Sequence, residues 1–564
     1  MIKTVKYSLL VYLCLINSIQ LKSLNYGDSL VLNPITFQSP SPVGWLSQYE
    51  LYINFPELNA GPWQSIYMIQ KLKCDSRTKA DKYNCGEWDY VWDAILVHSD
   101  DTLNSLKLGS FITPYGKELR MGGDQGWEWS YDITDYAPYL VDNKKIIIGN
   151  NQELLDLKFI FIKGLPPRNV LSVKNIFPIG QDDGHYGEVF PYEYLSNDSL
   201  LREIEVDLDP YGSGYSIKTI ISGHGHEGAK NCCEWTSKNH SYIINGIEAF
   251  SWDVWKDCGE NPIFPQGGTW PYDRAGWCPG TKVDENIFEI TDIVVPGTTI
   301  SIDYRIDKMK DILEGKGVFR MAHQLFSYDK PNFSRNIAVV DIINPSSQDS
   351  YSRINPSLSN PKIKIRNNGS TTVKKMKVFY GLVGNDPSIF NWEGKLEFLE
   401  EELITLPLPN WDSLTRNNKF SVRVISPNGR KDEYIYDNKM ISDFNSPEIL
   451  DNYFSIHFKT NNLDRAKENS TILKDNYGNI LFEKNDFLDN HDYSMIFDLK
   501  NGFYEFILYD EKQNGIDQLW WQSSDLVGTK GSLNFLNSIG ETTHVFTPDF
   551  GESLRFYFHV GDLP

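Results

Sequence analysis

Apolar and polar residues alternate with a period of two along most of this chain, which is the pattern of half-buried β-strands. Turn-forming Gly, Asn, Asp and Pro separate the alternating stretches, whereas blocks of helix-forming residues are rare. Within residues 24–180 and 181–330 the pattern predicts strands at 49–55, 65–72, 88–97, 108–113, 127–133, 144–148, 157–162, 201–208, 216–222, 240–244, 249–254, 287–293, 299–306 and 318–328. We therefore expect two neighbouring β-sandwiches over these two regions.

The second half of the chain begins after a stretch rich in Asn, Pro and Ser at 343–362, which is typical of a linker. Further strands are predicted at 362–366, 376–382, 453–459, 493–499, 504–509 and 554–560. They indicate a small Ig-like sandwich over 340–440 and another β-sandwich over 441–564. The 564 residues are thus expected to form an all-β protein with four β-sandwich domains.

Charge indicates which partners are unsuitable, and hydropathy near the N-terminus indicates where the protein works. The net charge is −21 and no basic block interrupts it, so nucleic acid and anionic membrane surfaces are poor partners. Lys3, Lys6 and the apolar run 8–16 predict a signal peptide at 1–22, cleaved between 19 and 23. The alternative is a buried strand or a membrane anchor, although the run is too short to span a bilayer. We expect a secreted protein without membrane insertion, working extracellularly or in the lumen of the secretory or lysosomal pathway.

The cysteine count supports an exported protein. One of the seven cysteines, Cys14, lies in the predicted signal, and an even number remains: Cys74, Cys85, Cys232, Cys233, Cys258 and Cys278. Six cysteines after an export signal predict three disulfides, all in the first half of the chain. Cys74 and Cys85 bracket a polar loop, and a bond there would stabilise the fold by about 3 kcal/mol. A bond between the adjacent Cys232 and Cys233 would form a strained ring, so their pairing is left open.

Two acidic–aromatic pairs are the strongest candidates for chemistry. Asp89 follows Glu87 and Trp88 where a loop enters a predicted strand, and Glu234 precedes Trp235 beside two cysteines. An indole beside a carboxylate reduces its hydration and raises its pKa, which suits proton transfer. Indole and carboxylate together are also typical of sugar binding. The alternative is that the tryptophans pack in the core and the acids are solvated.

Arg274 stands between Asp273 and the turn Gly276-Trp277-Cys278. A fixed guanidinium there would hold an acyl oxygen or polarise a carbonyl group. The alternative is an ion pair with Asp273 or another nearby acid. The sequence leaves both possibilities open.

Metal ligands are weakly indicated at two places. His224 and His226 project to the same side of a strand, but no third ligand is specified, so we expect them at the polar rim of a cleft with no metal. The oxygens between Asp510 and Asp517 are spaced around a glycine and are compatible with either a calcium turn or a solvated turn.

Five motifs in the first half resemble the bacterial peptide-N-glycosidase F family. They are Cys85-Gly-Glu-Trp-Asp89, Phe111-Ile-Thr-Pro-Tyr115, Thr219-Ile-Ile-Ser-Gly-His-Gly-His226, Cys232-Cys-Glu-Trp235 and Asp273-Arg-Ala-Gly-Trp-Cys-Pro-Gly280. They follow the family order over roughly residues 45–330. The resemblance implies two adjacent jelly-roll domains and the hydrolysis of the bond between asparagine and N-acetylglucosamine.

The resemblance also assigns roles to individual residues. The principal catalytic aspartate of the family falls on Asp89, its essential glutamate on Glu234 and its substrate-cleft arginine on Arg274. The family disulfides fall on Cys258 with Cys278 and on Cys74 with Cys85. Substrate-binding positions are expected at Trp88, Glu87, His224, His226, Trp235, Trp277 and Glu153. No cofactor is implied.

Several positions depart from the family pattern. A further active-site glutamate, followed by a tryptophan in the family, has no direct counterpart here, although Glu153 from a shifted loop is a candidate. His224 replaces a cleft tryptophan. Thr236 replaces a cysteine, while Cys233 is an addition. These departures bear on the rate and on the choice of glycan.

The resulting expectation is a secreted, monomeric amidase that acts on N-glycosylated proteins or glycopeptides. The alternative is a non-catalytic glycan-binding or adhesion protein on the same scaffold, which the departures and the two extra β-domains favour. A copper monooxygenase on a related double jelly roll would need more histidine ligands than His224 and His226 supply.

Overall fold

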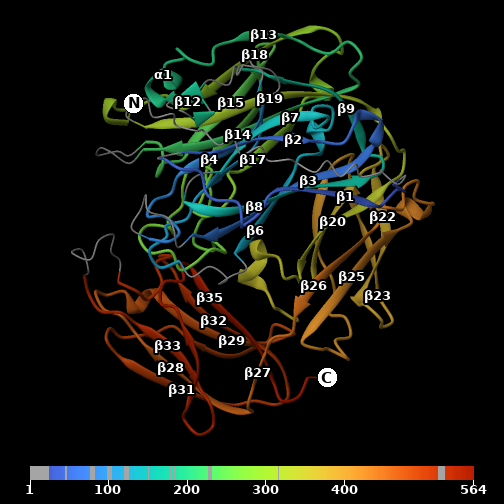
Figure 1. Cartoon of the computed structure of the whole chain (residues 1–564). Coiled ribbons are helices and arrows are strands. Elements are labelled where there is room, and N and C mark those ends of the chain that lie inside the picture. The colour runs from blue at the N-terminus through green and yellow to red at the C-terminus, as the bar shows by residue number, and fades with distance from the viewer. Residues whose placement is uncertain are drawn as a thin grey trace, which may run out of the picture.

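The computed structural model describes residues 24–44, 47–75, 83–97, 105–119, 126–149, 152–177, 181–182, 185–186, 188–225, 232–314, 317–518 and 527–563. The predicted signal peptide and its cleavage site lie outside these residues. Strands dominate the described chain, and the one α-helix within it, α1 (Tyr192–Ser196), is five residues long (Figure 1). The predicted all-β class is therefore confirmed. No helix in the described part of the chain is long and apolar enough to cross a bilayer.

The first sandwich has the strand order of a jelly roll. Its strands are β1 (Ser29–Ile35), β2 (Tyr49–Asn54), β3 (Trp63–Cys74), β4 (Val91–Val97), β5 (Leu106–Ile112), β6 (Trp127–Asp132), β7 (Asn143–Ile148) and β8 (Glu153–Lys163). One sheet has the order β1-β8-β3-β6 and the other has the order β2-β7-β4-β5. Eight strands shared in this way between two antiparallel sheets form a jelly roll.

The second sandwich repeats the same order. Its strands are β12 (Glu188–Pro191), β13 (Ile204–Asp207), β14 (Gly214–His224), β15 (Lys238–Ile244), β16 (Ile247–Val254), β17 (Glu285–Glu289), β18 (Thr299–Ile306) and β19 (Val318–Pro331). The sheets have the orders β12-β19-β14-β17 and β13-β18-β15-β16. Strand β9 (Arg168–Asn175) follows β8 and pairs with β19, so it ties the first jelly roll to a sheet of the second. The short strands β10 (Gln181–Asp182) and β11 (His185–Tyr186) pair with each other.

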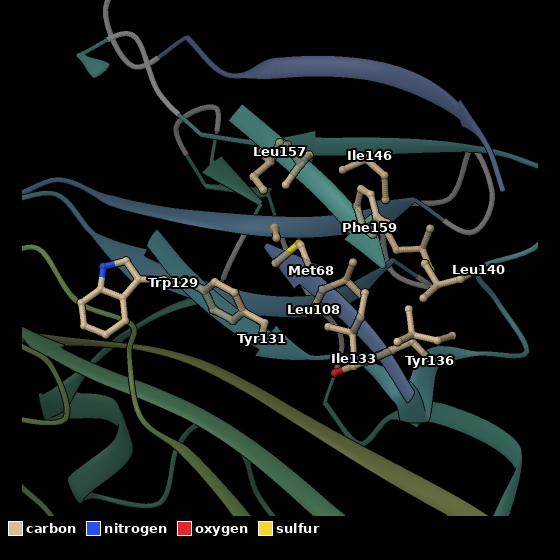
Figure 2. Close-up of a cluster of buried hydrophobic side chains, with 14 of the residues drawn as sticks. Met68, Leu108, Trp129, Tyr131, Ile133, Tyr136, Leu140, Ile146, Leu157 and Phe159 are labelled. Atoms are coloured by element: carbon tan, nitrogen blue, oxygen red, sulfur yellow. The ribbon is translucent and has the colours of Figure 1, made fainter. Parts of the chain in front are cut away.

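The core of the first jelly roll follows directly from the alternating sequence. In β6, Trp127, Trp129 and Tyr131 are buried while the residues between them are exposed. Figure 2 shows Tyr131 beside Met68 of β3, with Phe159 of β8 further along the cluster and Trp129 at its other end. Burial of each such side chain contributes about 1.5 to 3 kcal/mol, so the paired sheets are held together mainly by this layer.

The second half forms two more sandwiches. The third consists of β20 (Ile337–Asn344), β21 (Lys362–Asn367), β22 (Val373–Leu382), β23 (Ser388–Leu396), β24 (Glu401–Thr405), β25 (Asn417–Ile425) and β26 (Lys439–Asn445). Its sheets are β20-β21-β24 and β23-β22-β25-β26, an arrangement close to Ig-like sandwiches.

The fourth sandwich is drawn in orange to red in Figure 1. It consists of β27 (Glu448–Leu450), β28 (Tyr453–Lys459), β29 (Asn469–Asp475), β30 (Ile480–Lys484), β31 (Asp492–Asp498), β32 (Gly502–Asp510), β33 (Ser532–Leu536), β34 (Thr542–Phe546) and β35 (Ser553–Val560). The sheet orders are β27-β35-β32-β29-β30 and β31-β28-β33-β34.

A long connection between β16 and β17, residues 255–284, positions the candidate site. It lies against the end of β5 in the first jelly roll, because Gly280 N donates to Ile112 O at 2.9 Å and Ile112 N donates to Thr281 O at 3.1 Å. A disulfide between Cys258 and Cys278 closes this 255–284 segment. The segment therefore joins the two jelly rolls where their loops meet.

Candidate active site

Asp89 and Tyr115 are brought together by the pairing of β4 with β5. Asp89 lies two residues before β4 and Tyr115 three residues after β5, and Val91 pairs with Ile112 in the antiparallel register. Just beyond that pair, Tyr90 N donates to Thr113 Oγ1 at 2.7 Å. The Tyr115 hydroxyl then donates to Asp89 Oδ2 at 2.8 Å. Strand register thus gives this half-buried carboxylate a fixed hydrogen-bond donor.

Glu234 comes from the second jelly roll, in a turn that follows β14. Cys232 and Cys233, directly before it, are bonded to each other. The turn packs so closely on Gly317 that a Cβ there would lie 2.0 Å from Cys232 O, so only glycine fits. Glu234 N also donates to Gly225 O at 3.3 Å, and 7% of the Glu234 surface is exposed. The backbone therefore holds this carboxylate in a buried position.

Arg274 of the 255–284 segment links the two acidic residues. Its Nε donates to Glu234 Oε1 at 3.2 Å, and its Nη2 donates to the Tyr115 hydroxyl at 3.2 Å. The remaining hydrogen bonds run to backbone oxygens, including Tyr272 O at 2.6 Å from Nη1 and Thr269 O at 2.9 Å from Nη2, and to the Thr269 hydroxyl at 3.2 Å from Nη2. Arg274 is fully buried, and each of its three guanidinium nitrogens donates within the protein. The ion pair goes to Glu234, whereas the Asp273 carboxylate accepts from Cys258 N at 3.0 Å.

These surroundings set the ionisation of Asp89. Burial, reinforced by the negative charge of Glu234, raises the pKa of Asp89 to about 7, while the Arg274 charge and the Tyr115 hydrogen bond act in the opposite direction. Burial together with the negative charge of Asp89 raises the pKa of Tyr115, so its hydroxyl keeps its proton. A carboxyl group that ionises near neutral pH can accept or donate a proton during a reaction.

The aromatic residues divide into an exposed and a buried set. Trp88, next to Asp89, is 37% exposed. Trp235 is half-buried, and the Arg274 guanidinium lies 4.1 Å from its ring centroid. Trp277 is 1% exposed and lies 4.9 Å from the same guanidinium, so we assign it to holding Arg274 rather than to stacking on a substrate.

His224 is stacked on Trp277 with 5.2 Å between the ring centroids, and its Nε2 lies 2.8 Å from Ser222 Oγ. Burial and the charges of Arg320 and Arg274 lower the pKa of His224 to about 3. The imidazole is therefore neutral at physiological pH. His226, the other histidine of the pair, lies outside the described residues.

Glu87 and Glu153 lie near the loop that carries Asp89. Glu87 is half-buried, two residues before Asp89. Glu153 is 2% exposed at the start of β8 and pairs with Cys74, which is bonded to Cys85. The structure thus places Glu153 beside the disulfide at the base of this loop. The role of both glutamates in binding stays a prediction.

The described residues contain no group of three His, Cys, Asp or Glu side chains arranged to hold a metal ion. In the 510–517 turn, the oxygens considered for calcium face a guanidinium: Arg465 Nη1 donates to Asp517 O at 2.6 Å, and Arg465 Nη2 donates to Gly515 O at 3.0 Å. The positive charge at this turn is therefore supplied by the chain itself.

Tyr115 lies within a sequence motif but was not predicted as a site residue. Its detectable signal is the strand pairing, since the residue before β4 must face the residues after β5. Gln266, which contacts Tyr115, and Thr269 and Trp270, which contact Arg274, were not predicted either. Their positions depend on the fold of the 255–284 segment and leave no local pattern. The three disulfides are Cys74–Cys85, Cys232–Cys233 and Cys258–Cys278, which answers the pairing question left open above.

The chain is similar to several known proteins. The family model described as "Peptide-N-glycosidase F, C terminal" matches residues 192–326. A curated relative, peptide-N(4)-(N-acetyl-beta-D-glucosaminyl)asparagine amidase F of Elizabethkingia miricola, is 28% identical over 268 residues, which cover 43% of this chain and 67% of the relative.

Solved structures were compared as well. PNGase F, a glycosylasparaginase from Flavobacterium meningosepticum, is 22% identical with a TM-score of 0.45, and the match covers 54% of this chain and 96% of that one. PNGF-II is 16% identical with a TM-score of 0.42, and the match covers 53% of this chain and 65% of that one.

Proposed function

We propose that this chain, which is related to the peptide-N-glycosidase F family, is an amidase that removes N-glycans from proteins or glycopeptides. Water would add to the side-chain amide carbon of the glycosylated asparagine, and the bond from that carbon to nitrogen would break. The products would be an aspartyl peptide and a glycosylamine, which hydrolyses to the free glycan and ammonia. The observation that carries the proposal is the contact chain from Asp89 through Tyr115 and Arg274 to Glu234.

In this proposal Asp89 is the group at the reacting amide. It is half-buried, its neighbour Trp88 is 37% exposed, and its pKa of about 7 allows proton transfer at neutral pH. Asp89 orients or activates the attacking water or transfers a proton to the leaving nitrogen. Trp88 supplies a flat apolar surface for the CH face of the first sugar ring.

Glu234 and Arg274 affect the reaction through their charges, because both lie buried near Asp89. The buried guanidinium donates from all its nitrogens within the protein, so it acts through its charge and through Tyr115 rather than as a free clamp. A fixed positive charge in a water-poor site stabilises negative charge that develops on a nearby amide oxygen. Glu234 orients Arg274 and, at 7% exposure, has a small open surface for a sugar hydroxyl or water.

We also propose that the protein is exported and works outside the cytosol. The three disulfides support this, because reducing conditions in the cytosol disfavour such bonds. N-glycosylated proteins occupy the same compartments, which agrees with the proposed substrate.

The test of function is a mass measurement. Purified protein is incubated with a denatured N-glycoprotein, in parallel with the Asp89→Asn variant, and the peptides are weighed. We expect a gain of about 1 Da at each former glycan site, because asparagine becomes aspartate, and loss of that gain in the variant. Glycopeptides that stay intact but bind to the protein would reject the amidase and favour the glycan-binding alternative.

A further inference from the structure

The fourth sandwich is attached to the 255–284 segment by a specific carboxylate. Asp549, just before β35, accepts from the Trp270 indole Nε1 at 2.7 Å and from Gly267 N at 2.9 Å. Trp270 is fully buried. Figure 1 shows this sandwich directly against the loops of the first half. Two hydrogen bonds from one carboxylate therefore fix both the backbone and a side chain of the segment.

A second set of contacts surrounds this attachment. Arg353, in the short helix η6 (Asp349–Ile354), donates from Nε to Asn261 O and from Nη1 to Phe550 O, both at 2.8 Å. Its guanidinium lies 3.7 Å from the Phe264 ring centroid. Glu552 N also donates to Gly259 O at 2.9 Å. The segment is thus held against the fourth sandwich along residues 259–270.

The same stretch of the segment contacts the candidate site from its other side. Thr269 O and Trp270 O accept from the Arg274 guanidinium at 2.9 and 3.4 Å. The Gln266 side chain accepts from Tyr115 N at 2.9 Å, and Tyr115 in turn donates to Asp89. Asp549 binds Gly267 and Trp270, and the residues next to these, Gln266 and Thr269, bind Tyr115 and Arg274. Tyr115 and Arg274 are two of the groups that act on the Asp89 carboxylate.

We propose that Asp549 is a positioning residue for the reaction and that the fourth sandwich is part of the catalytic unit. The inference rests on the proposed function of the Asp89 site and adds a residue about 460 positions away in the sequence (549 minus 89). Asp549 holds Gly267 and Trp270, and these hold the carbonyl groups and Gln266 that orient Arg274 and Tyr115. Misplacement of catalytic groups by about 1 Å is enough to reduce rates by about a hundredfold.

The perturbing variant is Asp549→Asn, made in the full chain. An amide keeps one acceptor oxygen but turns its NH₂ group toward an N–H donor, so one of the two hydrogen bonds is lost. The matched control is Asp475→Asn in the same sandwich. One oxygen of Asp475 accepts from two backbone N–H groups and the other accepts from Asn479 Nδ2 at 2.8 Å, so the amide loses one of these hydrogen bonds as well. Asp475 is at the end of β29 away from the 255–284 segment. The other end of β29, at Asn469, pairs with Asp510, and Asp510 N donates to Glu552 O beside the attachment.

We expect Asp549→Asn to lower kcat about tenfold or more with KM changed less than twofold, and to move the pH limb of kcat/KM that reports Asp89. Asp475→Asn should change neither. If Asp549→Asn does not fold, Trp270→Phe removes the indole donor while keeping a smaller aromatic ring, and it should reproduce these changes. A folded Asp549→Asn protein with the wild-type kcat and pH limb would overturn the proposal, as would an equal loss in the control.

Hydrogen–deuterium exchange of the wild type and both variants separates this inference from the proposed function. We expect faster exchange across 259–277 in Asp549→Asn and unchanged exchange there in Asp475→Asn. If the wild type releases no glycan, the amidase proposal fails, while faster exchange still supports Asp549 as the residue that positions the segment. Unchanged exchange in a folded Asp549→Asn protein would refute that role whatever the activity.

Discussion

Two conservative substitutions are expected to shift the ionisation of Asp89 in opposite directions. The Tyr115 hydroxyl donates to Asp89 at 2.8 Å and stabilises the carboxylate, so Tyr115→Phe should raise the pKa of Asp89 above its present value of about 7. The charge of Glu234 disfavours the carboxylate, so Glu234→Gln should lower that pKa. The opposite signs follow from the two contacts and do not depend on which form of Asp89 is active.

The magnitudes follow from the geometry. A hydrogen bond to a charged group contributes about 1.5 to 3 kcal/mol, which corresponds to about one to two pH units. Contacts of 3.2, 3.2 and 2.8 Å through Arg274 and Tyr115 link Glu234 to Asp89, and the charge of Glu234 is one cause of the raised pKa of Asp89. At an effective dielectric constant of about 20, two like charges about 8 Å apart repel by about 2 kcal/mol, or about one and a half pH units, and we take this as the scale of the shift in Glu234→Gln.

The assay is the pH dependence of kcat/KM for a fluorescent N-glycopeptide between about pH 5 and 9, where the free-enzyme ionisation appears as a limb. We expect a limb near pH 7 in the wild type, above it in Tyr115→Phe and below it in Glu234→Gln. Tyr136→Phe is the control, because the Tyr136 hydroxyl donates to Lys107 O in the core, away from Asp89. Shifts in the same direction, or a control that shifts equally, would refute the electrostatic account.

Two further predictions concern stability. Arg274→Met should lower the free energy of unfolding by about 3 to 5 kcal/mol in urea titrations, because it leaves Glu234 buried without a cation. The control is Lys419→Met, which breaks an exposed pair with Asp443 and should lower that free energy by less than about 1 kcal/mol. Equal losses in the two variants would contradict the prediction. Burial lowers the pKa of His323 to about 3, so the unfolded chain binds more protons between about pH 3 and 6.5 and wild-type stability falls as pH drops through that window. His323→Asn should remove about 1.4 kcal/mol per pH unit of that dependence, and parallel stability curves for the two proteins would show that His323 does not supply it.

Much of the fold could be predicted because each strand carries its own signal. In β6 the alternation of Trp127, Trp129 and Tyr131 with polar residues assigns one face to the core before any partner strand is known. Strand β9 was missed, because its burial follows from pairing with β19, about 150 residues away along the chain (324 minus 175). The sandwiches are thus encoded locally, whereas the strand that joins them depends on tertiary contacts.

The candidate site was predictable in its charged residues and less so in their supports. Asp89, Glu234 and Arg274 stand beside tryptophans or cysteines, and that combination is uncommon enough to be noticed in a single sequence. Tyr115 and Gln266 have no such neighbours, and their role appears when the end of β5 meets the 255–284 segment. The choice between a substrate clamp and an ion pair at Arg274 could not be made from the sequence, since it depends on how many carbonyl groups the fold directs at the guanidinium.

The burial of the site residues indicates that the sandwiches contribute to the site in different ways. Arg274 and Glu234 are at most 7% exposed and are engaged with each other, whereas Asp89 is half-buried and Trp88 is 37% exposed. At these four residues the first jelly roll therefore exposes more surface than the second. The second jelly roll contributes charge that sets the pKa of Asp89, and the fourth sandwich holds the segment that carries Arg274. Substitutions that change glycan recognition should accordingly concentrate around Trp88, and those that change the pH profile around Arg274.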